Sequence, residues 1–195
     1  MDRLWRASAA RDITRAVVFE QAPINGANAQ GETPLHAAIQ RGAPLAVVAE
    51  LVRLGAQVNA LTHLLRSPLF LAVGHPNTRV LELLLENGAR VDGLRYQSAP
   101  LHAAVSLDDT ERVGILLAAG ADPNHPGPRG STPLFAATCA RMVQRLVQAG
   151  ANPHLRNRDG QHAIDWWREQ GREEALAAVA RPKVSRPVLK AVRCA

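Results

Sequence analysis

The chain has 195 residues, of which 47% are hydrophobic and 21% are charged, a composition typical of a soluble protein. No apolar run approaches the roughly 20 residues that a helix needs to cross a bilayer, and residues 1–5 lack the apolar core of a signal peptide. The net charge of +6 is concentrated in residues 181–195, which carry five cations and no acidic residue. The two cysteines form neither a metal motif nor a disulfide framework, so we expect a cytoplasmic protein that does not bind membranes.

Residues 2–25 form the first predicted segment. Their apolar residues, among them Leu4, Ile13 and Val17, follow a broken three- and four-residue spacing. Such spacing places apolar side chains on one face of a helix, and it predicts two short helices here.

A six-residue pattern that starts helices then recurs at a nearly constant distance. The first copy spans residues 33–38 and reads Thr-Pro-Leu-His-Ala-Ala. The Thr or Ser hydroxyl can accept a bond from the first turn, and Pro at the first helical position has its φ preset. A fixed period of 20–50 residues is typical of stacked supersecondary units. Later copies begin at Ser67, Ala99 and Thr132, with a degenerate copy at His162, in steps of 34, 32, 33 and 30 residues.

A second helix is predicted in each unit by an apolar triplet at positions i, i+3 and i+4. Such a triplet lies on one helix face, and the glycine three residues later ends the helix in the left-handed conformation at no steric cost. The triplets begin at Val48, Leu81, Val113 and Val143, and the glycines are Gly55, Gly88, Gly120 and Gly150.

The Thr-Pro-Leu-His-x-Ala pattern at this period resembles that of the ankyrin-repeat family. The resemblance implies an all-α fold, an ankyrin-repeat solenoid of stacked helix-turn-helix units joined by β-hairpin-like finger loops. We expect an N-terminal capping unit at 1–25, a C-terminal capping unit at 155–180 and a basic tail at 181–195. The four repeats between the caps are expected at about 26–59, 60–92, 93–124 and 125–154.

Several positions depart from the family pattern. Phe70 and Phe135 replace the motif histidine, and Ala99 cannot cap its helix, so that helix start should be the weakest. The connector before Ala99 is one residue short. The unit after Thr132 is three residues short between its helices, so residues 138–142 must turn tightly or shorten a helix.

The end of the chain carries two unusual features. Trp166 and Trp167 stand where an aliphatic and a small residue are usual, and we expect Trp167 to cover the open C-terminal end of the stack. For residues 181–195 two interpretations remain: a solvated end without a role, or a segment that folds back on the tryptophans or docks on a partner.

No pattern indicates catalysis, a cofactor or a metal. The resemblance implies that His36 and His102 hydrogen-bond between neighbouring loops, and no nucleophile or acid recurs beside them. The other histidines lack the spacing of metal ligands, and a phosphate-binding loop needs a lysine, but none precedes Lys183. We therefore predict that the protein is not an enzyme and has no catalytic, cofactor-binding or metal-binding residues.

The remaining candidate is a binding surface. In the ankyrin family the fingers and the ends of the inner helices form a concave groove that binds proteins. Arg and Tyr are enriched at binding hot spots, so we expect a partner with an acidic, partly apolar face. The alternative is that these arginines are ordinary solvated loop charges. The candidates are His63, Leu64, Arg66, Arg95, Tyr96, Arg129 and Arg158 on the fingers, and Gln40, Arg41, His75, Ser106 and Leu107 at the helix ends.

Two functions from different classes follow. The first is a monomeric, non-catalytic protein-protein interaction module: an adaptor, inhibitor or anchor. The second is nucleic-acid binding through the basic fingers and the tail, although a nearly neutral body with one tyrosine offers little base stacking. A third possibility is a substrate adaptor for a ubiquitin ligase, which would need a helical box after the repeats, and we expect the 15 residues at 181–195 to be too few for a complete one.

Overall fold

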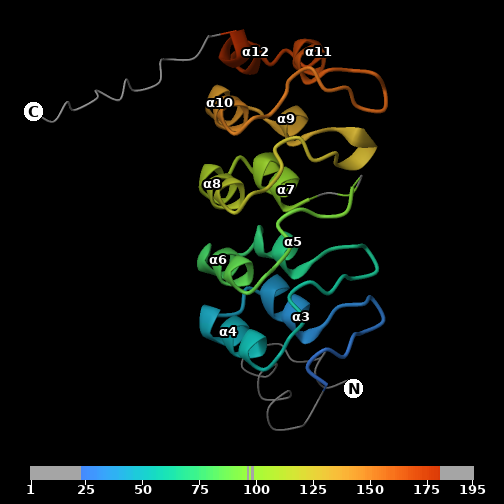
Figure 1. The fold of residues 1–195 in the computed structure, drawn as a ribbon, viewed down its shortest axis with the longest axis vertical. Coiled ribbons are helices and arrows are strands. Elements are labelled where there is room, and N and C mark those ends of the chain that lie inside the picture. The colour runs from blue at the N-terminus through green and yellow to red at the C-terminus, as the bar shows by residue number, and fades with distance from the viewer. Residues whose placement is uncertain (1–22, 96, 98, 181–195) are drawn as a thin grey trace, which may run out of the picture.

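Ten α-helices in the described residues form five successive helix-turn-helix pairs that stack along one axis (Figure 1). The computed structural model describes residues 23–95, 97 and 99–180. Within these ranges an isolated bridge between Arg156 and His162 is the only β-pairing, and no helix is long and apolar enough to cross a membrane. The predicted all-α solenoid is confirmed. The helices are α3 (Pro34–Gln40), α4 (Leu45–Arg53), α5 (Pro68–Ala72), α6 (Arg79–Glu86), α7 (Pro100–Ser106), α8 (Thr110–Ala118), α9 (Pro133–Ala136), α10 (Ala140–Gln148), α11 (Ala163–Glu169) and α12 (Glu173–Ala180), with a 3₁₀ turn, η1 (Pro128–Gly130), before α9.

The first helix of each pair lies beside the loops that project from one edge of the stack, and the second lies on the opposite side (Figure 1). We call α3, α5, α7, α9 and α11 the inner helices, and α4, α6, α8, α10 and α12 the outer helices.

Predicted capping is confirmed at Ser67, whose Oγ accepts a bond from the Phe70 N–H at 3.1 Å. The prediction of a side-chain cap is wrong for Thr132, whose buried Oγ1 has no hydrogen-bond partner among the described residues.

The outer helices bury the predicted triplets. In α4, α6, α8 and α10 the first two members of each triplet are fully buried, and the third packs against the same core. The glycine after each of these helices has a positive φ, between 80° and 100°. Both predictions are therefore confirmed: one apolar face enters a core that runs along the stack, and a left-handed glycine ends each helix.

The short unit after Thr132 loses its missing residues from a helix, which is one of the two predicted alternatives. α9 has four residues, whereas α3 and α7 have seven, and Ala137 is already extended, with a ψ of 130°. The early end leaves carbonyl groups without helical partners. The Arg172 guanidinium reaches back from the last unit and donates to the Ala137 oxygen at 2.9 Å and to the Phe135 oxygen at 3.4 Å.

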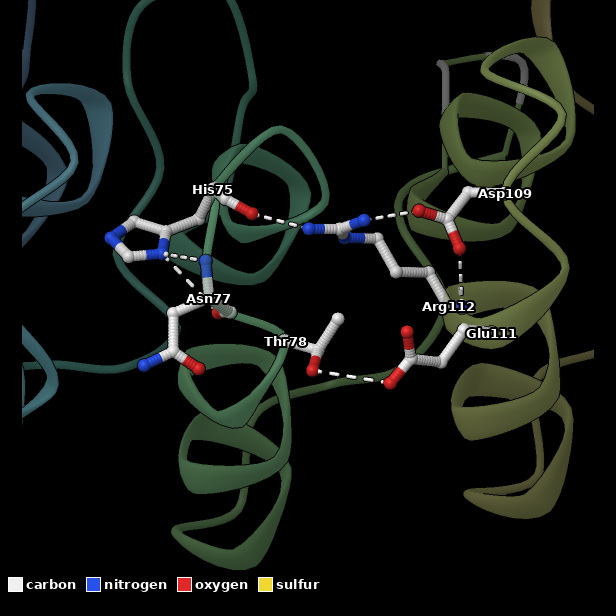
Figure 2. A network of polar contacts seen from close by, with 6 residues as sticks. All are labelled: His75, Asn77, Thr78, Asp109, Glu111 and Arg112. Carbon is white, nitrogen blue, oxygen red and sulfur yellow. Dashed lines mark hydrogen bonds and ion pairs between the residues drawn. The ribbon is translucent and has the colours of Figure 1, made fainter.

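Two further arginines tie adjacent units together in the same way. Figure 2 shows Arg112 of α8 donating both to the Asp109 carboxylate and to the backbone oxygen of His75 in the preceding unit. Arg145 of α10 donates to the backbone oxygen of Thr110 at 2.8 Å. These bonds are charge-assisted and Arg112 is largely buried, so they add directional links to the apolar packing.

On the outer side, asparagines repeat a second link between units. Asn59 donates its side-chain N–H to the Gly88 oxygen at 2.9 Å and accepts the Arg90 N–H at 2.7 Å. Asn25 and Asn124 make the same two bonds to their following units. Asp92 holds the equivalent place in the third link, where it accepts the Asp122 N–H at 3.2 Å.

The expectation for Trp167 is wrong. Its side chain is 0% exposed and belongs to the buried core, with α12 following it and packing against α11, so it does not form the open end of the stack. Residues 1–22 of the predicted N-terminal cap and the tail at 181–195 lie outside the described residues.

Candidate partner-binding surface

Four of the five fingers at the edge of the stack share one hairpin geometry. In each, the first residue donates its N–H to the oxygen of the fifth, and the fourth donates to the oxygen of the first. The fourth residue has a positive φ in every case. The fingers with this pattern are finger 1 (28–32), finger 2 (62–66), finger 4 (127–131) and finger 5 (157–161). Finger 3 (94–97) is shorter, with the Gln97 N–H donating to the Leu94 oxygen at 3.1 Å.

Backbone hydrogen bonds join neighbouring fingers. The His63 N–H in finger 2 donates to the Gln30 oxygen in finger 1 at 2.9 Å. In the equivalent bond, the Arg158 N–H in finger 5 donates to the Arg129 oxygen in finger 4 at 2.8 Å. These bonds hold the fingers of each pair side by side, as in a β-sheet.

The motif histidines connect inner helices to fingers, as predicted. Nε2 of His36 lies 3.2 Å from the Arg66 oxygen, and Nε2 of His102 lies 3.0 Å from the Ser131 oxygen. Burial disfavours the charged ring, so it lowers the pKa of His36 and lowers that of His102 to about 4. Gly127 permits the second contact, since a Cβ there would overlap the His102 ring. Both histidines are thus neutral structural groups at neutral pH.

Phenylalanine at the histidine position of the motif changes the surface. Phe70 lies beneath Arg66, whose guanidinium carbon is 5.7 Å from the ring centroid. Phe135 lines a pocket of about 340 Å³, which we call the groove pocket. Its walls come from inner helices α7, α9 and α11 and from fingers 4 and 5, and include His102, Ser106, Arg129, Thr132, Phe135, Asp159, Gln161 and Trp166.

Of the predicted site residues, the groove pocket contains Ser106 and Arg129, while sequence reasoning missed Phe135, Gln161 and Trp166. The departure of Phe135 from the family's histidine was the available signal. The other predicted residues that are exposed in the structure lie along the fingers and helix ends: Gln40, Arg41, His63, Leu64, Arg66, Arg95, Leu107 and Arg158.

His75 was wrongly predicted to lie at an exposed helix end. Its side chain is 3% exposed, and Nε2 lies 3.0 Å from the Ala43 oxygen of the preceding unit. Nδ1 accepts the Asn77 N–H at 3.0 Å, which leaves Nε2 as the donor (Figure 2). The ring is therefore used within the stack and cannot contact a partner. Tyr96 lies outside the described residues.

The arginines of the fingers differ in their surroundings. Arg129 forms an ion pair with Asp159 of finger 5, with a nitrogen-oxygen distance of 2.8 Å. Arg66 is exposed and lies over Phe70.

Leu64 at the tip of finger 2 is 70% exposed, as predicted. Among the described residues no group of three His, Cys, Asp or Glu side chains is placed to hold a metal. The arrangement is a mixed polar and apolar surface that can bind another molecule.

Family models match most of the chain. The model for three copies of ankyrin repeats matches residues 4–94 and 45–127, and the single ankyrin-repeat model matches residues 129–158. The chain therefore belongs to the ankyrin-repeat family, and the resemblance inferred from its motif is confirmed. Ankyrin repeats generally mediate protein-protein interactions, and the family is generally non-catalytic.

Individual relatives share the repeats over part of their length. The chain is 35% identical to the mouse B-cell lymphoma 3 protein homolog over 121 residues, covering 61% of this chain and 27% of that protein. It is 38% identical to human ankyrin repeat and SOCS box protein 5 over 90 residues, covering 46% of this chain and 27% of that protein. The matches thus span 27% of the length of these two relatives.

The fold also matches a solved structure. The chain aligns with a TM-score of 0.80 to a chain in the structure of a predatory endopeptidase from Bdellovibrio bacteriovorus in complex with an immunity protein. The alignment covers 94% of this chain and 99% of that chain at 22% identity. At this identity the similarity shows the fold.

Proposed function

We propose that the chain is a non-catalytic module that binds a protein partner through its fingers and inner helices, as an adaptor, inhibitor or anchor. The observation that carries the proposal is the groove pocket of about 340 Å³. Side chains from three successive inner helices and two fingers converge there, with Phe135 and Trp166 supplying apolar surface and Gln161 a polar group. Concave, largely apolar sites with a few polar groups are typical of binding sites.

The proposed partner has an acidic, partly apolar face. Arg66 and Arg95 are exposed on fingers 2 and 3, and Arg129 lies at the wall of the groove pocket. Leu64 on finger 2 and Leu107 at the end of α7, 70% and 61% exposed, provide apolar surface. Arginine contributes strongly at interfaces because its planar group donates to carboxylates and also packs against apolar surface.

Charge reversal tests the surface. A partner is isolated by affinity purification from the native host, and its affinity is measured for the wild type and for the Arg66→Glu, Arg95→Glu, Arg129→Glu triple variant. A matched control reverses Arg53, Arg79 and Arg141, which are exposed on the outer helices α4, α6 and α10 rather than on the fingers or inner helices. The finger variant should bind about tenfold more weakly or worse, and the control should bind normally. Equal affinity of the finger variant and the wild type would exclude this surface.

Nucleic-acid binding has no specific support in the described residues. Arg53, Arg79, Arg112, Arg129 and Arg168 are each paired with a carboxylate. The alternative rests on residues 181–195, which lie outside the described ranges. Salt-dependent retention on DNA that disappears when 181–195 are deleted would favour nucleic acid over a protein partner.

A further inference from the structure

Exposed leucines gather at fingers 2 and 3. Six large hydrophobic side chains of the described residues are exposed, and four of them lie on or beside these two fingers. We call these four, Leu61, Leu64, Leu65 and Leu94, the leucine patch. Three of them line a pocket of about 80 Å³ between the two fingers, together with Phe70 and Pro100. A concentration of exposed apolar side chains in one place marks an interaction site more often than scattered ones do.

Leu65 occupies a backbone position that suits glycine. Its φ is 58°, and it is the fourth residue of finger 2. The fourth residue is Gly31 in finger 1, Gly130 in finger 4 and Gly160 in finger 5, with φ between 73° and 76°. A branched side chain in this left-handed region is strained, and Leu65 is 43% exposed, so burial does not fully compensate. Backbone strain of this kind concentrates at functional sites.

The charged residues on the two fingers beside the leucine patch are all positive. Finger 2 contains Arg66, finger 3 contains Arg95, and neither finger contains an acidic residue. The pocket wall adds Arg90. The carboxylate in that wall, Asp92, already accepts the Asp122 N–H at 3.2 Å. An apolar patch flanked by guanidinium groups complements aliphatic side chains flanked by carboxylates.

We propose that the leucine patch docks an extended segment of a protein partner in which an aliphatic side chain is flanked by Asp or Glu. The aliphatic side chain enters the pocket between Leu61, Leu65 and Leu94, and the carboxylates face Arg66 and Arg95. The proposal rests on the proposed function and assigns the chemistry of one part of that surface.

The test uses the full chain and a phage-displayed library of short random peptides. Enriched peptides are synthesised with a fluorophore and titrated against the wild type, Leu65→Gly and Leu65→Asn. Glycine and asparagine both tolerate the left-handed backbone, so both variants keep the turn and remove the apolar side chain. Leu155→Ala, at an exposed leucine before finger 5, is the matched control.

We expect the enriched peptides to carry an aliphatic residue flanked by Asp or Glu. Both Leu65 variants should bind them about tenfold more weakly or worse, whereas Leu155→Ala should bind normally. Leu65→Gly should at the same time unfold at a higher denaturant concentration than the wild type, because the strain is removed. Loss of binding in a more stable protein separates a contact from a folding defect.

Three results would overturn the proposal: no enriched peptides, enrichment of Lys- or Arg-flanked peptides, or equal binding by the Leu65 variants. Peptides that bind the Leu65 variants normally but fail to bind Phe135→Ala would move the contact to the groove pocket. The proposed function would then stand without the leucine patch. Failure of the finger charge reversals to affect a purified partner would exclude the whole finger surface, which is a different outcome from the loss of the leucine patch alone.

Discussion

Nδ1 of His36 lies 2.9 Å from the hydroxyl oxygen of Thr33, and this pair is absent from the second, third and fourth copies of the motif. In the second copy Phe70 replaces His, and the Ser67 hydroxyl accepts the Phe70 N–H instead. In the third copy Ala99 replaces Thr, and Nδ1 of His102 is buried without a hydrogen-bond partner among the described residues. In the fourth copy Phe135 replaces His, and Oγ1 of Thr132 is likewise buried without a hydrogen-bond partner among the described residues. Each of these copies therefore retains either the hydroxyl or the histidine and lacks the hydrogen bond between the two side chains.

Ala99→Ser should stabilise the protein. Nε2 of His102 faces the Ser131 oxygen and must donate to it, so Nδ1 is an acceptor that a serine hydroxyl can satisfy. Satisfying a buried polar atom should raise the free energy of unfolding by about 1 kcal/mol, measured by urea denaturation. In a His102→Phe background the gain should be smaller, because the new hydroxyl can then only cap the helix, as Ser67 does in the second copy. A gain of equal size there would mean that the new hydroxyl acts only as a helix cap.

Acid should destabilise the fold through its buried histidines. Burial holds the pKa of His102 at about 4, while the unfolded ring titrates near its ordinary value of about 6.5. Between these values the unfolded chain binds more protons than the folded chain, so stability is complete above about pH 6.5 and falls as the pH decreases. The loss from His102 should approach about 3 kcal/mol near pH 4. Urea denaturation across this range should show a shallower pH dependence for His102→Phe, and identical slopes would contradict the assignment.

Asp92→Asn should repair the third asparagine link. Asn59 both donates and accepts, whereas ionised Asp92 can only accept. Burial raises the pKa of Asp92, so its charged form is a cost to the folded state at neutral pH. The variant should gain about 1 kcal/mol at pH 7. Its advantage should shrink as the pH falls through the raised pKa, because the protonated carboxyl can donate as the amide does.

The reverse substitution is the matched control for this link. Asn59→Asp should lose a donor to the Gly88 oxygen and should lower the free energy of unfolding at neutral pH by a similar amount. Thermal or urea denaturation of both variants against the wild type makes the comparison. Equal stability of all three proteins would show that these side chains do not link the units.

Arg112→Met should weaken the junction between the second and third described units. The substitution keeps the apolar stem but leaves the His75 oxygen and the Asp109 carboxylate without the guanidinium (Figure 2). Hydrogen bonds to charged groups contribute about 1.5–3 kcal/mol, so a loss of that size is expected in chemical denaturation. Arg79→Met, which removes an exposed pair with Glu82, should change stability by less than about 1 kcal/mol. Equal effects of the two substitutions would argue against the inter-unit role.

Helix starts and ends were predictable because their signals are local. Pro34 and its counterparts begin the first four inner helices, and Gly55 and its counterparts follow the outer helices, each within one turn of the residues it affects. His75 was not predictable in this way. Its partner, the Ala43 oxygen, lies 32 positions earlier in the chain. Whether such a ring is exposed depends on how two units stack, which a single unit's pattern does not contain.

The candidate site was predictable in its location and less so in its residues. Family resemblance placed the surface on the fingers and inner helix ends, where most of the predicted residues are exposed. It could not reveal the groove pocket, because Phe135 and Trp166 meet there only after three inner helices are aligned. Leu65 is a similar case. Its left-handed backbone could be predicted only by aligning finger 2 with the fingers whose fourth residue is glycine, because the leucine itself gives no signal for this conformation.

Pro128 stands in finger 4 at the position from which His63 and Arg158 donate to the finger before them. Proline has no N–H, so finger 4 cannot make that bond to finger 3. Among the described residues, these backbone bonds join finger 1 to finger 2 and finger 4 to finger 5. A bound molecule long enough to reach from the leucine patch to the groove pocket would therefore link these two pairs of fingers.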